Sequence, residues 1–313
     1  MNNIYGNWAT LLLPLREDES IDMLLLEREV SHLIGAKVNG IYSNGTAGEF
    51  YTLTPAEFAS TAELLAGMCT AAGMPFQIGA SHFSAQTMLE RIRIARQYDP
   101  TAIQVILPDW LPVTNEEAVI FLQRAAETAG DIPLVVYNPP HAKRVLKPED
   151  WTVLLDAVPQ IASIKVKDGD EAWYEAMKPV LERTAVFVPG HHLATGFIRG
   201  AKGAYSNVAC LSPVKAQRWY ELMKTDPQAA LREERNVQAF MAAHISPLAS
   251  RHGHHGLALD KYMATLGGWC DITPRIRFPY RSVPVTRLEE DRAALLHMAP
   301  YFADDAISPD GRG

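Results

Sequence analysis

Short apolar segments alternate with longer stretches of helical periodicity along most of the chain. Several of the apolar segments are rich in Val and Ile, and they are too short to be helices, which favours buried β-strands. Eight such segments occur, at residues 7–13, 40–44, 76–81, 102–107, 133–138, 161–167, 185–190 and 203–209. Because a helix-like stretch follows each one, the pattern predicts parallel strands joined by right-handed helical crossovers.

Capping signals mark the boundaries of the helix-like stretches. Thr54 precedes Pro55 and Glu57, an order typical of a helix N-terminus. Another stretch begins at Thr114 and ends at Gly130, where a C-cap residue is expected. Eight strand–helix units indicate a closed (β/α)8 barrel. The alternative is an open doubly wound sheet, but no GxGxxG motif follows the first strand to support nucleotide binding.

The barrel pattern accounts for residues 1–225, and the remaining residues, 226–313, are helical in pattern. We therefore expect a C-terminal helical extension packed on a barrel that carries the active site. The run HGHH at 252–255 resembles a metal-binding tract, but we expect a polar turn there, away from the strand ends. The last residues, 304–313, have the composition of a frayed tail.

Composition narrows the classes of function. Hydrophobic residues make up 48% and charged residues 21% of the chain, which indicates a globular protein, and the net charge of −7 argues against nucleic-acid binding. The three cysteines are far apart, which argues against a disulfide framework or a zinc site and favours a reducing compartment. No apolar stretch is long enough to cross a membrane, and the N-terminus lacks the features of a signal peptide. We therefore expect a cytoplasmic protein without a membrane or nucleic-acid partner.

The sixth predicted strand carries two lysines within the sequence IASIKVKDGD, residues 161–170. Alternation places Ile164 and Val166 toward the helices, so that Lys165 and Lys167 are expected to point into the barrel. Shielding from water and a second nearby amine would both lower the pKa of such a lysine, which makes it a nucleophile toward ketones. The alternatives are that the lysines bind a phosphate or pair with the acidic residues at the strand end.

Two more strand ends carry motifs that, together with the lysine strand, resemble one known family. The three segments are Gly45-Thr46-Ala47-Gly48-Glu49, Tyr137-Asn138-Pro139-Pro140 and Ile164-Lys165-Val166-Lys167-Asp168-Gly169-Asp170. They are similar to the hallmarks of the dihydrodipicolinate synthase / N-acetylneuraminate lyase family of class I aldolases, and the likeness extends over the whole chain. It implies a TIM barrel with C-terminal helices and a Schiff-base lyase that acts on pyruvate or a 2-keto-3-deoxy acid. It also implies a homotetramer, built as a dimer of dimers, that needs no metal and no organic cofactor.

The resemblance assigns catalytic roles to three side chains. Lys165, rather than the second lysine, attacks the C2 ketone, and the resulting iminium makes C3 acidic. Tyr137 moves protons, with the hydroxyl of Thr46 as its partner, and the backbone N–H groups of Thr46 and Ala47 hold the substrate carboxylate. The alternatives are an ordinary buried tyrosine and a plain glycine turn. Glu49 is expected to be structural, at the start of the following helix.

The ends of strands seven and eight are expected to contact the substrate. In the family, the position after strand seven helps to decide the substrate. Gly190 would leave room there, and His191 would receive a carboxylate or hydroxyls at the far end of the substrate. Solvated loop histidines are the alternative. Tyr205 and Ser206 end strand eight, and the backbone at Tyr205 would orient the nucleophile or the substrate.

Three departures from the family pattern bear on the substrate. Trp110 stands where the synthases donate a tyrosine across a subunit interface, and an indole cannot relay a proton as a phenol does. Ala142, followed by Lys143 and Arg144, stands where those synthases carry an arginine, and Ala47 replaces a hydroxyl residue of the cradle. We therefore expect Trp110 near the substrate or an interface, and a catabolic aldolase or dehydratase. The alternatives are a 4-hydroxy-tetrahydrodipicolinate synthase with unusual substrate loops and a non-catalytic keto-acid binder.

Overall fold

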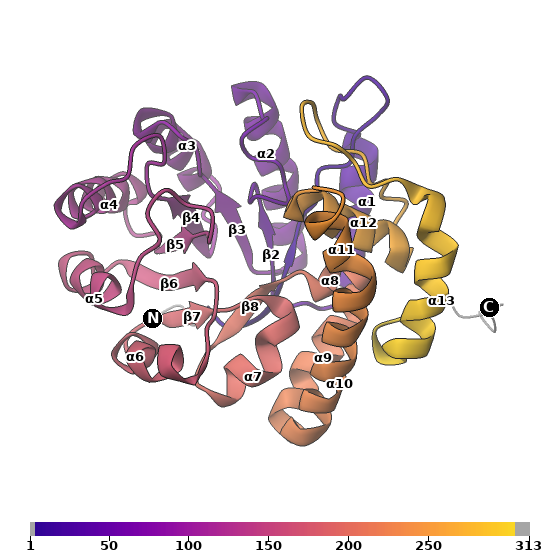
Figure 1. The fold of residues 1–313 in the computed structure, drawn as a ribbon. Helices are drawn as coiled ribbons and strands as arrows, with labels where there is room; N and C mark the ends of the chain where they lie inside the picture. The colour runs from indigo at the N-terminus through magenta and orange to yellow at the C-terminus, as the bar shows by residue number, and fades with distance from the viewer. Residues whose placement is uncertain (1–3, 304–313) are drawn as a thin grey trace.

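Eight parallel strands form a closed barrel in chain order in the computed structural model, which describes residues 4–303 (Figure 1). The strands are β1 (Gly6–Thr10), β2 (Gly40–Ser43), β3 (Phe76–Gly79), β4 (Ala102–Ile106), β5 (Leu134–Asn138), β6 (Ile161–Val166), β7 (Ala185–Phe187) and β8 (Gly203–Ser206). Because β8 pairs with β1 and closes the sheet, the predicted (β/α)8 barrel is confirmed and the open sheet is excluded.

Helices surround the barrel and follow the strands in turn. They are α1 (Met23–Gly35), α2 (Pro55–Ala72), α3 (Ala85–Arg96), α4 (Asn115–Ala129), α5 (Pro148–Ala157), α6 (Glu171–Leu181), α7 (Leu193–Ile198), α8 (Val208–Leu211) and α9 (Pro213–Thr225). Thr54 and Thr114 are the N-caps of α2 and α4, and each forms the reciprocal pair of hydrogen bonds of a capping box. Gly130 is the C-cap of α4. The capping signals in the sequence therefore placed these boundaries well.

A helical extension continues after the barrel. It comprises α10 (Pro227–Phe240), a π-helical segment (Met241–Ile245), α11 (Ser246–Ser250), α12 (Gly256–Gly267) and α13 (Leu288–Met298). These helices pack along one side of the barrel, where α10 contacts α7 and α9, and α12 contacts α8 (Figure 1). The predicted C-terminal helices are confirmed, whereas the domain division between residues 225 and 226 stays a prediction. The expected tail, residues 304–313, lies outside the described residues.

Aromatic side chains fill the interior of the barrel. The inner cluster consists of Ile4, Trp8, Tyr42, Ala102, Val135, Phe187 and Tyr205. The ring of Tyr205 contacts those of Tyr42 and Phe187, with centroids 4.6 Å and 4.9 Å apart. Since this cluster occupies the barrel interior, open space for a ligand remains at the carboxyl ends of the strands.

Within residues 4–303, no helix combines the length and the apolar character that crossing a membrane requires.

Candidate active site

A cavity of about 590 Å³ lies at the carboxyl ends of the strands, between the barrel and the extension. Its walls come from β1, β2, β4, β5, β6 and β8, from the loops that follow them, and from α12. Five of the predicted site residues line it together: Thr46, Ala47, Tyr137, Lys165 and Tyr205. Active sites occupy this end of the barrel in (β/α)8 enzymes, so the location fits catalysis.

Lys165 points into this cavity and is surrounded by aromatic rings. Its Nζ lies 4.2 Å from the ring centroid of Tyr137, 5.1 Å from that of Tyr205 and 5.2 Å from that of Tyr42. Burial lowers the pKa of Lys165 to about 8, although the nearby carboxylate of Asp260 favours the charged form. An amine with this pKa is neutral in about a tenth of the molecules at pH 7, a far larger share than for an ordinary lysine.

The second lysine of the strand does not point into the barrel, so that expectation was wrong. Strand β6 ends at Val166, and Lys167 is exposed beyond it. Side chains alternate only within the strand, which is why the pattern could not be extended by one residue. The hydrogen bond with Asp168 raises the pKa of His192, and the charge of Lys167 only opposes that rise, whereas the pKa of Lys165 is lowered by burial and not by the second lysine. Burial alone therefore accounts for the depressed pKa of the amine.

Tyr137 lies beside Lys165 because the two residues are register partners on β5 and β6, and partners in a parallel sheet point to the same side. Burial raises the pKa of Tyr137 to about 12, and a hydrogen bond with the side chain of Thr46 lowers it. Thr46 is brought there by the loop after β2. A Cβ on Gly45 of that loop would lie 1.3 Å from the hydroxyl of Tyr42, so only glycine fits this approach.

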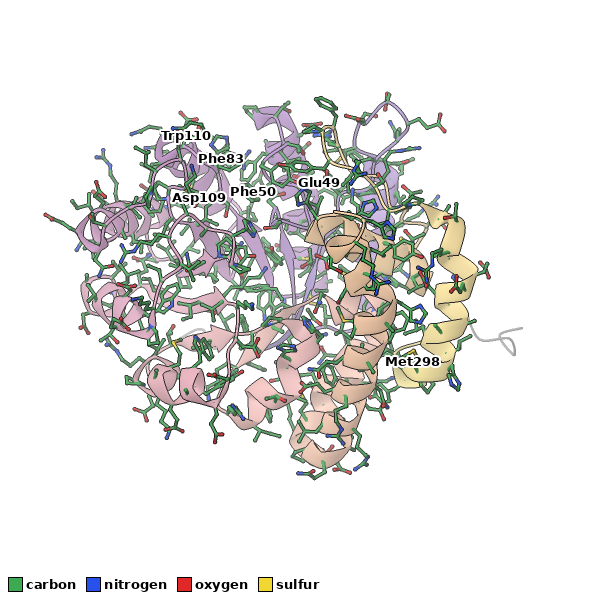
Figure 2. All side chains as sticks on the ribbon, in the orientation of Figure 1. Glu49, Phe50, Phe83, Asp109, Trp110 and Met298 are labelled. Atoms are coloured by element: carbon green, nitrogen blue, oxygen red, sulfur yellow. The ribbon has the colours of Figure 1, made fainter. Side chains whose placement is uncertain are left out.

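Glu49 fixes the same loop to the extension. Its buried carboxylate accepts a hydrogen bond from Lys261 Nζ at 2.5 Å and another from the backbone N–H of Arg277 at 2.9 Å. The side chain is structural, as expected, but it does not begin the next helix: it has a left-handed backbone, with φ of 52°, and α2 starts only at Pro55. Figure 2 shows Glu49 next to the extension, beside Phe50.

Tyr205 lines the cavity, but the other predicted residues of strands seven and eight, Gly190, His191 and Ser206, do not, and they lie next to the lining residue Asn207. The backbone N–H of His191 donates to Asn207 Oδ1 at 3.2 Å, and burial lowers the pKa of the His191 ring to about 4. A Cβ on Gly190 would come within 2.6 Å of Ser206 Oγ, which accepts a hydrogen bond from Ala209 N. These three residues therefore support Asn207, and their predicted contacts with substrate stay predictions.

Trp110 does not line the cavity in the single chain, although the adjacent residue Asp109 does. Its side chain is 76% exposed, and Figure 2 shows it at the outer rim with Phe83. Lys143 holds the loop, because its Nζ donates to the Trp110 carbonyl at 2.7 Å and lies 5.0 Å from the indole ring. A contribution of Trp110 to the site would come across a subunit interface, and that role stays a prediction.

The extension supplies lining residues that the sequence did not indicate. Leu257 and Asp260, three positions apart on α12, both line the cavity, as does His255 just before the helix. The expectation that residues 252–255 lie away from the strand ends was therefore wrong for His255. Burial raises the pKa of the Asp260 carboxyl to about 7, and the charge of Lys165 opposes that rise.

Within residues 4–303, no group of three or more His, Cys, Asp or Glu side chains could hold a metal ion.

Arg144 also lines the cavity, but its guanidinium is already used by the protein. It donates to the carbonyl of Val113 at 2.7 Å, to Asp150 at 2.9 Å and to the side-chain oxygen of Asn115. The described cavity wall contains one arginine and one lysine. Arg144 is held by these hydrogen bonds, whereas the ammonium group of Lys165 forms none within residues 4–303. The other basic side chains of the described cavity wall are those of His141 and His255.

Comparison with known proteins agrees with this geometry. The model of the dihydrodipicolinate synthetase family matches residues 3–256. A 4-hydroxy-tetrahydrodipicolinate synthase from Thermomicrobium roseum is 29% identical over 210 residues, which cover 66% of this chain and 68% of that protein. A trans-O-hydroxybenzylidenepyruvate hydratase-aldolase from Sphingobium xenophagum is 24% identical over 315 residues, which cover 93% of this chain and 92% of that protein.

A likeness in fold accompanies the likeness in sequence. YagE, a prophage protein of the dihydrodipicolinic acid synthase family from E. coli K12 solved in complex with pyruvate, superposes with a TM-score of 0.82. The match covers 95% of this chain and 99% of that chain at 19% identity. Because the family model spans most of the barrel and all three motif segments, the chain belongs to the dihydrodipicolinate synthetase family, a family of class I Schiff-base aldolases and lyases.

Proposed function

We propose that Lys165 forms a Schiff base with pyruvate or a 2-keto-3-deoxy acid, and that the enzyme then makes or breaks the C3–C4 bond or removes water. The observation that carries this proposal is an amine whose pKa burial lowers to about 8, at the strand ends and beside the phenol of Tyr137. The neutral amine attacks C2, and the iminium that forms draws electrons from C3. Either outcome, C–C cleavage or dehydration, follows from that one intermediate.

The loop after β2 and strand β5 supply the groups that would bind the substrate carboxylate and transfer protons near the amine. Thr46 and Ala47, at the cavity wall, offer backbone N–H groups for the carboxylate of the keto acid. Tyr137, whose ring lies 4.2 Å from Lys165 Nζ, would pass a proton from the attacking nitrogen to the C2 oxygen. With these roles, the substrate carboxylate would bind to the loop after β2, and the reacting carbon would lie next to Lys165.

The walls of the cavity favour a keto acid with an apolar tail over one with a polar tail. Beyond the amine, the lining side chains are mostly aromatic or aliphatic: Phe50, Tyr51, Phe83, Ile106, Leu107, Val113, Leu257 and Tyr280. Such a surface binds an aromatic ring more favourably than a polyhydroxylated chain. The Sphingobium xenophagum hydratase-aldolase, named for an aromatic pyruvate adduct and matching nearly the whole chain, supports this class.

The synthase alternative is less well supported. 4-Hydroxy-tetrahydrodipicolinate synthases carry an arginine near this position for the carboxylate of their aldehyde substrate, and here the position is Ala142. The guanidinium of Arg144, two residues further on, already donates hydrogen bonds to Asp150 and Asn115. A non-catalytic keto-acid binder would not need Tyr137 and Thr46 beside the amine.

Trapping with borohydride tests the proposed Schiff base. Incubation with pyruvate and borohydride is expected to add one reduced pyruvate to the chain, and peptide mapping is expected to place it on Lys165. Lys165→Arg keeps the charge but is expected to abolish the adduct. An adduct on Lys167 would move the nucleophile, and the absence of any adduct would favour the non-catalytic binder.

A panel of aldol substrates tests the substrate class. Pyruvate release is measured from 2-keto acids that carry an aromatic, an aliphatic or a polyhydroxylated group at C4. We expect the aromatic compounds to give the highest kcat/KM, because the distal wall is apolar. Preference for the polyhydroxylated compounds would instead support a sugar-acid aldolase.

A further inference from the structure

Helix α12 brings a carboxylate into the cavity from outside the barrel. Leu257 and Asp260 occupy the face of α12 that lines the cavity. The charge of Asp260 acts on Lys165, favouring its ammonium form, and on Tyr137 and Tyr42, raising their pKa values. Asp260 is thus near the reactive amine and the proton-carrying phenol at once, although it comes from the extension.

The helix holds this carboxylate in place through the next residue. Lys261 is fully buried, and its ammonium donates to Glu49 at 2.5 Å and to the carbonyl of Arg275 at 2.6 Å. A residue adjacent to such an anchor has little freedom to move, so Asp260 is fixed relative to the loop after β2. Preorganisation of this kind is what a proton-transfer group requires.

The carboxylate of Asp260 has no structural task to explain its position. In the part of the chain that the structure describes, it accepts no hydrogen bond and forms no ion pair, and the partner whose charge it feels is Lys165. Burial raises its pKa to about 7. Because Asp260 is half-buried and lines the cavity, this carboxyl group is open to a ligand, and a role in the reaction is the better explanation.

We propose that Asp260 is a second catalytic residue, which moves protons at the Lys165 nitrogen and at the departing C2 oxygen while the Schiff base forms. This inference rests on the function proposed above. No direct contact joins Asp260 to Lys165 among the described residues, so we expect a water molecule or the substrate oxygen to carry the proton between them. Both groups line the cavity that the ketone would occupy.

One aspartate is enough to balance the proton transfers by which the Schiff base forms. The carboxylate takes a proton from the ammonium of Lys165, and the neutral amine then attacks C2 of the keto acid. Tyr137 passes one proton from nitrogen to oxygen, which gives the carbinolamine. The carboxylic acid of Asp260 protonates the carbinolamine hydroxyl, the C–O bond breaks, and water leaves. The iminium and the carboxylate remain, with the same net charge as at the start.

Tyr137 cannot replace Asp260 in this role. With a pKa of about 12, its phenol passes protons along but does not hold one as a phenolate at neutral pH. The neighbouring Thr46 is not ionisable in this range. Asp260 is therefore the group in the described cavity wall that both interacts with Lys165 and titrates near neutrality.

The variant Asp260→Asn, which keeps the shape of the side chain but cannot carry the proton, tests the proposal in the full-length protein. The rate of pyruvate adduct formation is followed by quenching with borohydride at increasing times and measuring intact mass. We expect the rate to fall about 100-fold while the final adduct still forms on Lys165. Asp271→Asn, at an exposed acid just after α12, is the matched control and should keep the wild-type rate.

Each outcome decides between the possibilities. A wild-type rate in Asp260→Asn would overturn the catalytic role, whereas failure of the wild type to trap pyruvate would overturn the proposed function itself. Thermal unfolding and circular dichroism establish whether the variant is folded. If it is not, Asp260→Glu decides, because a folded glutamate variant should show a shifted pH dependence of adduct formation. An unshifted pH dependence there would also overturn the role of Asp260.

Discussion

At the scale of single residues, the site is defined by two ionisable groups whose pKa values converge. Burial moves the amine of Lys165 down to about 8 and the carboxyl of Asp260 up to about 7. In water these groups would be separated by several pKa units and both would be fully charged at neutral pH. With pKa values this close, transfer of a proton from one group to the other would cost little free energy, which the proposed formation and loss of an iminium needs.

The pH dependence of adduct formation should therefore be bell-shaped. Below about pH 7 both groups are protonated, so no carboxylate accepts the proton of the Lys165 ammonium. Above about pH 8 both are deprotonated, so no acid expels the C2 oxygen. The two limbs belong to the coupled pair. Single-turnover trapping with pyruvate between pH 5 and about 10 measures the profile, and a rate that rises without limit to high pH would contradict the pairing.

Tyr137→Phe should slow turnover far more than it weakens binding. Removing a positioned proton carrier costs about 100-fold or more in kcat, while KM should change little because the ring still packs on Lys165. Steady-state kinetics of pyruvate release measure both constants. Tyr98→Phe, outside the cavity wall, is the control. An unchanged kcat in Tyr137→Phe would remove the phenol from the reaction.

At the scale of elements, the loop after β2 depends on a helix far away in the chain. The buried pair of Glu49 and Lys261 joins that loop to α12, and Arg277 adds a backbone hydrogen bond to the same carboxylate. One helix thereby holds the loop that is proposed to bind the carboxylate and also carries Asp260 in the cavity wall. The extension therefore lines the candidate active site as well as covering the barrel.

Breaking this buried pair should damage both stability and substrate binding. Lys261→Met leaves the carboxylate of Glu49 buried without its cation, which is expected to cost about 3–5 kcal/mol of unfolding free energy. Urea unfolding measures that cost, and the KM for pyruvate should rise because the cradle loosens. The double variant Glu49→Gln with Lys261→Met should recover part of the stability. A single variant as stable as the wild type would show that the pair does not anchor the loop.

Local patterns in the sequence predicted the elements well, and long-range contacts were where prediction stopped. The apolar segments and the caps at Thr54 and Thr114 are local signals, and they gave the strands and the helix starts. Lys167 was misplaced because strand alternation ends at Val166. Asp260 gave no signal, since a charged residue on an amphipathic helix ordinarily faces solvent and nothing local shows that α12 folds over the barrel.

At the scale of the whole molecule, the apolar rim of the cavity suggests the assembly. Trp110 and Leu111 are 76% and 71% exposed at the rim. Large exposed apolar side chains next to a site are typical of interfaces. We propose that the protein is a homotetramer in which a second copy covers this rim. Its predicted place in the cytoplasm stays a prediction.

Trp110→Glu should weaken that assembly. Sedimentation of the wild type is expected to give a tetramer, and the variant should sediment as a smaller species because a charge would be buried at the interface. Lys143→Ala, which removes a cation from the same loop without adding a buried charge, should disturb assembly less. A monomeric wild type would contradict the proposed assembly, and an unchanged tetramer in the variant would place the interface elsewhere.

The most direct measurement is a crystal structure of the protein after exposure to pyruvate. The chemistry proposed for Lys165 predicts continuous electron density from its Nζ to C2 of pyruvate, with the carboxylate on the backbone of Thr46 and Ala47 and the carboxyl group of Asp260 facing the C2 position. Pyruvate bound in the cavity without a covalent bond to Lys165, or joined to a different lysine, would contradict it.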